Sequence, residues 1–298
     1  MKNFNNMPLP WKRFRDFIAP DIDRFAVLKN ILDEVNIENS IITISGNRHF
    51  FISPPKTPQP AAETRQTILV AHYDRSPGSP GANDNSAAVF ILIETALKLL
   101  KNSVRNWYMI FTDKEELTGG EGIRDQGAYT LARGLLNAGL ENARIYNFDA
   151  CGAGDTLIIS TTAEHLLKNE GSGKNKKIRS SIRDLREFAL EKARQLGMGK
   201  VLLAPTPFSD DAGFLHAGLA AQTITILPSG ESTMLISTLR RYPGFTKVLV
   251  NHESRNARSE NFVPETWRIF NTSLDSHLRL TPENFYTVLC FAEALCKG

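Results

Sequence analysis

The stretch that decides the fold is Thr67 to Ala88, which reads TILVAHYDRSPGSPGANDNSAA. Its first part, Ile68 to Ala71, has the length and composition of a buried β-strand. The strand stops at His72 and Asp74, and a loop rich in Gly and Pro leads to Asp84, where a helical pattern opens. Ligands of open α/β sheets bind at the carboxyl ends of the strands. The stretch therefore predicts a polar site at one edge of a sheet.

Along the rest of the chain, short apolar runs alternate with amphipathic patterns. The expected strands cover residues 41–44, 49–52, 68–71, 106–112, 143–148, 156–160, 201–203 and 222–227, and the expected helices cover 21–35, 84–100, 127–138, 180–196 and 282–296. This alternation is typical of an α/β protein with helices on both faces of a largely parallel sheet. We expect one domain over residues 1–298, with an insertion rich in loops at about 230–265.

Length and composition narrow the class of protein. Of the 298 residues, 42% are hydrophobic and 22% charged, which is ordinary for a globular domain. The net charge of +3 is too small to indicate a nucleic-acid partner, and no apolar stretch approaches the ~20 residues of a membrane span. The N-terminus lacks an apolar signal segment, and the three cysteines form no paired framework. We therefore expect a cytoplasmic protein with unpaired thiols and no membrane partner.

Acidic side chains follow three successive predicted strands. Asp74 follows the first strand, Glu115 and Glu116 follow the second, and Asp149 follows the third, while Asp84 lies at the helix start beside them. Carboxylates crowded at one edge repel each other unless a cation neutralises them. Two divalent ions ~3.5–4 Å apart would do so, and they would lower the pKa of a shared water towards ~7.

His72 and Asp84 are the candidate metal ligands of the central stretch. Asp74, two residues beyond His72, is placed to accept a hydrogen bond from the other imidazole nitrogen, which would fix the tautomer. Glu115 and Glu116 suit a division of labour, because the alternation of side chains breaks at the end of a strand. One of them can face the metal, and the other can face the bound water as a general base.

Several motifs in this order resemble peptidase family M28, the zinc-dependent exopeptidases. They are His72-Tyr73-Asp74, Gly81 to Ser86, Phe111 to Glu116, Asn147-Phe148-Asp149, and Ser209 to Phe214 with Ala217 to Ala220. The matches run from about residue 67 to 290, and their combination is specific although each motif alone is weak. The family includes dizinc aminopeptidases and glutaminyl cyclases. The resemblance implies a three-layer α/β/α sandwich around a mixed, mainly parallel central sheet.

The resemblance also implies a set of zinc ligands. His72 and Asp149 would bind one zinc ion, Asp84 would bridge both ions, and Glu116 would bind the second ion. Two ions are expected, with a single ion as the alternative.

The sequence departs from the family near the C-terminus. Where the family supplies its last zinc ligand from a His-Thr dipeptide, this chain has Asn271 and Thr272, at the expected spacing before Pro282-Glu283-Asn284. A neutral amide oxygen is a poor zinc ligand. His277, six residues later, is the first choice as a replacement, with Asn271 itself and His252 as the alternatives. A further outcome is that the second site stays weak and one metal remains.

These residues favour a metallo-exopeptidase, most simply an aminopeptidase acting on a peptide or small amide. The resemblance makes Glu115 the general base, with Asp74 supporting His72. Glu115 would take a proton from the activated water and return it to the leaving amine. A second reading is a single-zinc glutaminyl cyclase or small-amide hydrolase, which the loss of the last ligand favours. A third is a non-catalytic binding protein on the same fold, although the retention of so many acids argues against it.

Overall fold

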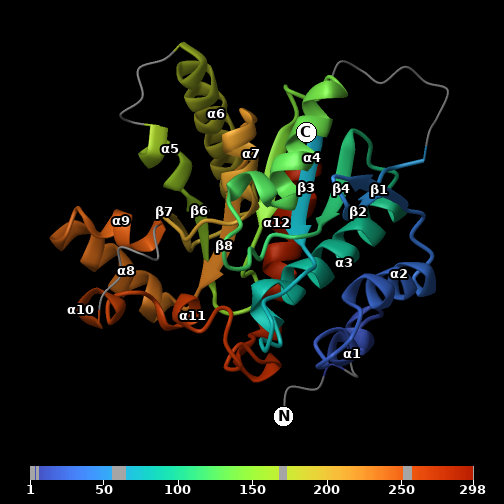
Figure 1. The fold of residues 1–298 in the computed structure, drawn as a ribbon, viewed down its shortest axis with the longest axis horizontal. Helices are drawn as coiled ribbons and strands as arrows, with labels where there is room; N and C mark the ends of the chain where they lie inside the picture. Colours follow the sequence, from blue (N-terminus) through green and yellow to red (C-terminus); the bar gives the residue numbers. More distant parts are fainter. Residues whose placement is uncertain (1–3, 5–6, 56–64, 168–172, 251–256, 298) are drawn as a thin grey trace.

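The computed structural model describes residues 4, 7–55, 65–167, 173–250 and 257–297. Within them lies an eight-stranded sheet with the order β1-β2-β4-β3-β5-β8-β6-β7 (Figure 1). The strands are β1 (Ser40–Ile44), β2 (Asn47–Ile52), β3 (Thr67–His72), β4 (Trp107–Thr112), β5 (Arg144–Phe148), β6 (Thr156–Ser160), β7 (Val201–Ala204) and β8 (Gln222–Leu227). The sheet therefore has β3 and β5 at its centre and β1 and β7 at its edges.

Strand pairing is mixed but mainly parallel. β3 is parallel to β4 and β5, β5 to β8, and β6 to β7. The pairs β1–β2, β2–β4 and β6–β8 are antiparallel. β1 and β2 form a hairpin, whose two turn residues, Ser45 and Gly46, both have positive φ, as a type I′ turn requires.

Helices cover both faces of the sheet (Figure 1). They are α1 (Phe14–Phe17), α2 (Arg24–Glu34), α3 (Ala87–Lys101), α4 (Gly127–Asn137), α5 (Thr162–Leu167), α6 (Gly173–Gln195), α7 (Asp210–Ala217), α8 (Ser229–Arg241), α9 (Phe245–Val250), α10 (Ala257–Glu260), α11 (Glu265–Arg268) and α12 (Phe285–Cys296). α2, α3, α6 and α12 contribute to the core on one face, and α4 and α7 to the core on the other. The three-layer α/β/α architecture predicted for the chain is confirmed.

The central strand β3 supplies both cores. All six of its residues are buried, which explains why its sequence is a continuous apolar run and not an alternating one. Leu69 and Ala71 pack in the core with α3 and α12, whereas Ile68 and Val70 pack in the core with α4. Because successive side chains of a strand point to opposite faces, a strand between two helical layers is apolar at every position.

The segment that we expected to form an insertion with loops is largely helical. α8 and α9 lie in it, and α8 buries Ser232, Leu235 and Thr238 at intervals of three residues, which is a helical face. Leu235 and Phe245 belong to a third core, which they share with Ile158 of β6. The prediction of loops was wrong because the apolar residues of these helices are sparse and alternate with exposed polar ones.

The thiols of the chain are unpaired, as expected from the sequence. All three cysteines are free in the structure, and Cys151 and Cys296 are buried. Among the helices of the described ranges, none combines the length and apolar character needed to cross a bilayer.

Candidate active site

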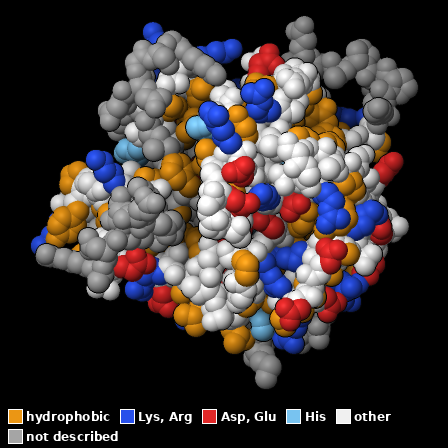
Figure 2. Space-filling view, in the orientation of Figure 1, with side chains coloured by type: hydrophobic (Ala, Val, Ile, Leu, Met, Phe, Trp, Pro, Cys, Tyr) orange, Lys and Arg blue, Asp and Glu red, His pale blue; other side chains and the backbone are white. Residues whose placement is uncertain are grey.

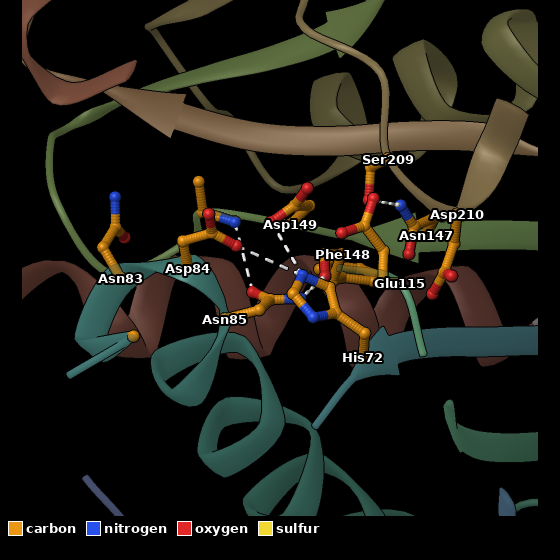
Figure 3. A network of polar contacts seen from close by, with 12 residues as sticks. His72, Asn83, Asp84, Asn85, Glu115, Asn147, Phe148, Asp149, Ser209 and Asp210 are labelled. Carbon is orange, nitrogen blue, oxygen red and sulfur yellow. Dashed lines mark hydrogen bonds and ion pairs between the residues drawn. The ribbon is translucent and has the colours of Figure 1, made fainter. Parts of the chain in front are cut away.

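Three neighbouring strand ends carry residues of the predicted site. His72 ends β3 and is in register with Thr112, which ends β4, and Asp149 directly follows β5. β4, β3 and β5 are adjacent and parallel, so their carboxyl ends meet at one edge. Figure 3 shows the result: Asp84 lies to the left of the His72 ring, Asp149 above it and Glu115 to its right.

Asp84 reaches this edge from a short irregular segment, Ala82–Ser86, that precedes α3. Gly81 has a φ of 59°, and a Cβ there would lie 2.7 Å from the carbonyl oxygen of Asp84, so the turn requires glycine. The carboxylate of Asp275 accepts hydrogen bonds from the backbone N–H groups of Asn83 (2.9 Å) and Asp84 (3.0 Å). The C-terminal part of the chain thus fixes the backbone that carries Asp84.

The side chain of Asn85 joins the same segment to the end of β5. Its Nδ2 donates to the carbonyl of Phe148 (2.8 Å), and its Oδ1 accepts from the N–H of Ala150 (3.2 Å). These bonds hold Asp84 and Asp149 close together although their charges repel each other.

His72, Asp84 and Asp149 form a compact group with the spacing of a metal site. His72 Nε2 lies 3.2 Å from Asp84 Oδ1 and 3.7 Å from Asp149 Oδ1. His72 is fully buried, and neither its Nε2 nor Asp149 Oδ1 has a hydrogen-bond partner among the described residues. Buried polar atoms are normally satisfied, and one imidazole nitrogen with two carboxylate oxygens is a donor set that zinc accepts. The residues therefore fit a divalent ion.

Asp74 connects the imidazole with the two glutamates. Its Oδ1 lies 3.4 Å from His72 Nδ1, an ion-pair distance at which no hydrogen bond is formed. The same carboxylate accepts hydrogen bonds from the backbone N–H groups of Glu115 (3.2 Å) and Glu116 (3.0 Å). This placement fits the supporting role that the sequence predicts for Asp74, and it extends that role to the loop after β4.

Glu115 and Glu116 have different partners. Glu116 Oε2 accepts from the hydroxyl of Ser76 (2.8 Å), and Glu116 Oε1 is buried without a hydrogen-bond partner in the described structure. Glu115 Oε1 accepts from Gln126 Nε2 (3.3 Å). Both side chains line the same cavity as Asp84 and Asp149. The two glutamates are thus held separately, as a division of labour between them requires.

Burial and crowding raise the pKa values of the carboxylates. Burial and the charge of Asp84 raise the pKa of Glu116 to about 8, and burial and nearby carboxylates raise that of Asp84 to about 6. Burial and the neighbouring acids also raise the pKa of Glu115 well above its usual range. Burial opposes protonation of His72, but three carboxylates outweigh it and raise the pKa of His72. Negative charge is in excess at this edge, and a bound cation would offset it.

Asp210 lies close to these carboxylates, although it is not among the site residues predicted from the sequence. It is fully buried at the start of α7, and its Oδ2 accepts from Thr112 Oγ1 (2.5 Å). Burial raises its pKa to about 7, and its charge acts on Glu115. Two adjacent acids opening a helix otherwise poor in charge were the available signal. Asp275, also missed, could have been found only from its spacing before Pro282.

The acids open into a cavity of about 1050 Å³. We call Asp84, Glu115, Glu116 and Asp149 the floor of this cavity. The wall includes Leu117, Ile123, Leu167, Ile178, Phe208, Leu215, His216, Glu260, Trp267, Arg268, Phe270 and Asn271. In the space-filling view, hydrophobic side chains gather between α5, α6 and α8 (Figure 2). The cavity is therefore acidic at one end and mainly apolar around it.

The three candidates for the last metal ligand differ in position. Asn271 lines the cavity together with the floor. His277 lies elsewhere, with its ring centroid 6.3 Å from that of Phe4 and with Arg15 close enough to lower its pKa together with burial. His277 is not among the cavity residues and does not belong to the group around His72. His252 lies outside the described residues.

The fold is that of an α/β protein, and a group of His and Asp side chains at its strand ends could hold a metal ion. The sequence matches the model of Peptidase family M28 over residues 55–258, which is more than half of the chain. The chain belongs to peptidase family M28. No curated protein sequence matches it significantly.

Solved structures with the same fold include aminopeptidases and glutaminyl cyclases. The zinc aminopeptidase BSAP from Bacillus subtilis superposes with a TM-score of 0.52 at 19% identity, over 84% of this chain and 48% of that chain. The LapA aminopeptidase from Legionella pneumophila superposes with a TM-score of 0.62 at 14% identity, over 96% of this chain and 69% of that chain. The glutaminyl cyclase from Porphyromonas gingivalis superposes with a TM-score of 0.60 at 17% identity, over 96% of this chain and 94% of that chain. The chain spans about half the length of the Bacillus enzyme, and at these identities the likeness shows the fold alone.

Proposed function

We propose that this protein is a metal-dependent aminopeptidase that hydrolyses the first peptide bond of its substrate. One observation carries the proposal: the unpartnered Nε2 of buried His72 faces two carboxylates, at 3.2 Å and 3.7 Å. A glutamate, Glu115, lines the cavity beside them. Metal-assisted hydrolysis needs side chains that hold the metal and, beside them, a carboxylate such as Glu115 that is not itself a metal ligand.

His72, Asp84 and Asp149 would hold one ion, and Asp84 with Glu116 would hold a second. When bound, the metal supplies a Lewis acid for the scissile carbonyl and lowers the pKa of water. Asp74 keeps the imidazole oriented, because it approaches His72 Nδ1 and leaves Nε2 directed at Asp84 and Asp149.

Glu115 is the proposed general base. Its carboxylate would take a proton from the attacking water and later give that proton to the leaving amine. Gln126 donates to Glu115 Oε1 and so orients the carboxylate. Asp74 fixes the Glu115 backbone through its N–H group. The base is thus held from both its side chain and its main chain.

The excess negative charge of the floor would favour substrates with a free N-terminus. An α-ammonium group close to Glu116 would be attracted by the carboxylates that the metal leaves uncompensated. A substrate blocked by an acetyl group lacks this charge and would bind more weakly.

The second candidate function is a single-metal enzyme such as a glutaminyl cyclase. The observation that favours it is the donor set: His72 is the one imidazole in the group that the described residues form. Asn271, at the position where the family has histidine, lines the cavity without offering a nitrogen ligand.

The test is a substrate panel on protein re-equilibrated with zinc and on the same protein after chelation. We expect release of the first residue from leucyl-glycyl-glycine, little release from the N-acetylated peptide, and loss of activity on chelation with recovery on adding zinc. Cyclisation of an N-terminal glutamine without hydrolysis of the other peptides would favour the second candidate. Absence of both reactions in zinc-loaded protein would contradict the proposal and leave the binding-protein reading.

A further inference from the structure

The cavity wall carries an arginine that the proposed chemistry does not use. Arg268, the last residue of α11, lines the same cavity as Glu115 and Glu116. The cavity residues named above all belong to the described parts of the chain, and Arg268 is the one Lys or Arg among them. One guanidinium in a cavity that is also lined by several carboxylates makes the charge of the lining strongly uneven.

The nearby acids are engaged with other residues. Glu265, on the same helix, forms an ion pair with Arg279 (2.7 Å). Glu231 accepts from both the N–H (3.0 Å) and the hydroxyl (3.1 Å) of Thr266. Glu260 also has a polar partner, and no ion pair within the described residues involves Arg268. The guanidinium is therefore open to an anion from outside the chain.

The position of Arg268 is fixed although its side chain is exposed. The neighbouring Trp267 is 2% exposed and packs in the core with Leu235 and Leu249. The N–H of Arg268 donates to the carbonyl of Pro264 (3.0 Å), and Thr266 is tied to α8. A short helix anchored at the two residues before Arg268 holds the base of this side chain at the cavity.

A carboxylate is the anion that suits this cavity. Guanidinium groups bind carboxylates through two parallel hydrogen bonds. The floor repels an anion, so a negatively charged substrate end can be accommodated only at a distance from the floor and next to a cation. The apolar wall, which includes Phe208, Trp267 and Phe270, would contact the chain of the substrate in between.

We propose that Arg268 binds the C-terminal carboxylate of the substrate and that the enzyme is selective for short peptides with a free C-terminus. The inference rests on the proposed function, since the floor takes the N-terminal end and the scissile bond. A cavity of about 1050 Å³ is at the upper end of the range for small ligands, which suits a di- or tripeptide. Arg268 is then a specificity-determining residue: it sets the length of the peptide, not the chemistry.

The first experiment measures kcat/KM for leucyl-glycyl-glycine and for its C-terminal amide on zinc-loaded protein. Parent protein is expected to favour the free acid by about 10-fold, the order of one charge-assisted contact. Arg268→Gln should bring the two substrates to within about 2-fold by raising KM for the acid, with kcat retained. The matched control is Arg240→Gln, an exposed arginine of α8 that does not line this cavity, and it should behave as the parent.

Equal cleavage of acid and amide by the parent would overturn this inference while leaving the proposed function intact. Cleavage of neither substrate would count against the proposed function, and binding then decides the inference. Calorimetric titration of zinc-loaded protein with glycyl-glycine and glycyl-glycinamide should show about 10-fold tighter binding of the acid, and Arg268→Gln should abolish the difference. No difference in the parent, or an undiminished difference in Arg268→Gln, would overturn it.

Discussion

The floor and the wall of the cavity are built in different ways. The floor comes from the ends of adjacent parallel strands and from a segment fixed by Asp275 and Asn85, and the imidazole of His72 beside it is fully buried. The wall comes from helices α5, α6, α7, α10 and α11 and from connections between elements, and it includes exposed side chains such as Phe208, Arg268 and Asn271. Chemistry that depends on fixed distances is placed on the sheet, and recognition of the substrate is placed on segments that can vary.

Glu115→Gln tests the floor with the largest expected effect. The amide cannot accept the proton, so kcat should fall about 10²- to 10⁴-fold, the range for loss of a general base. Zinc content should stay at the parent level, because the ligands are untouched. The measurement is steady-state kinetics together with metal analysis of the same sample. A variant with parent kcat would show that another group takes the proton.

Asp74→Asn weakens the floor without removing a ligand. The amide can no longer hold the Nδ1–H of His72 as a charged acceptor does, and zinc affinity should fall about 10- to 100-fold. Competition with a fluorescent zinc chelator measures it. Asp155→Asn, which removes a half-buried carboxylate paired with Lys200, is the control and should leave the affinity unchanged. Equal affinities of Asp74→Asn and the parent would remove Asp74 from the site.

His49 makes the sheet behind the floor sensitive to acid. Burial lowers its pKa to about 4, and its Nδ1 accepts from the N–H of Asp113, two residues before Glu115. The unfolded chain binds the proton with a pKa near 6.5, so this contribution to stability is complete above pH 6.5 and is lost as the pH falls towards 4. Between pH 7.5 and pH 5 the loss amounts to about 2 kcal/mol.

His49→Asn keeps an acceptor at the position of Nδ1 but does not titrate. Urea unfolding at both pH values should show a smaller loss of stability in the variant than in the parent, by up to about 2 kcal/mol. A parallel loss in both proteins would mean that His49 is protonated without cost in the folded state.

Phe208→Ala tests the wall and should have the smallest effect. Phe208 is 37% exposed, so its truncation removes only part of one contact with the substrate. KM should rise about 3- to 10-fold while kcat stays within about 2-fold, since the loss is of uniform binding. The same kinetic assay measures both. A large fall in kcat would mean that the wall positions the scissile bond, and the distinction between floor and wall would fail.

The sheet, and the meeting of the floor residues at one of its edges, could be predicted because both depend on short-range patterns. The buried strand before His72 is continuous in the sequence, and acids after three successive strands indicate one edge. Asp74 contacts His72 and the loop after β4, where its sequence spacing placed it. The fold class follows from the alternation of strands and helices.

The wall could not be predicted in the same way. Part of it comes from the short helices α10 and α11, and Trp267 of α11 is buried in a core with Ile158 of β6, a contact that sequence spacing does not encode. The position of His277 shows the same limit: its six-residue distance from Asn271 suggested a shared site, but the chain turns and places it beside Phe4. Asp210 and Asp275 were missed because each acts on a residue far away in the chain.

The most direct test of the metal site is anomalous diffraction at the zinc edge from crystals of the zinc-loaded protein. We expect a peak about 2.0–2.2 Å from His72 Nε2 and from oxygens of Asp84 and Asp149. A second peak between Asp84 and Glu116 would establish two ions, and its absence would establish one. A floor without any peak, or an ion bound at His277 in its place, would contradict the assignment of the floor as the metal centre.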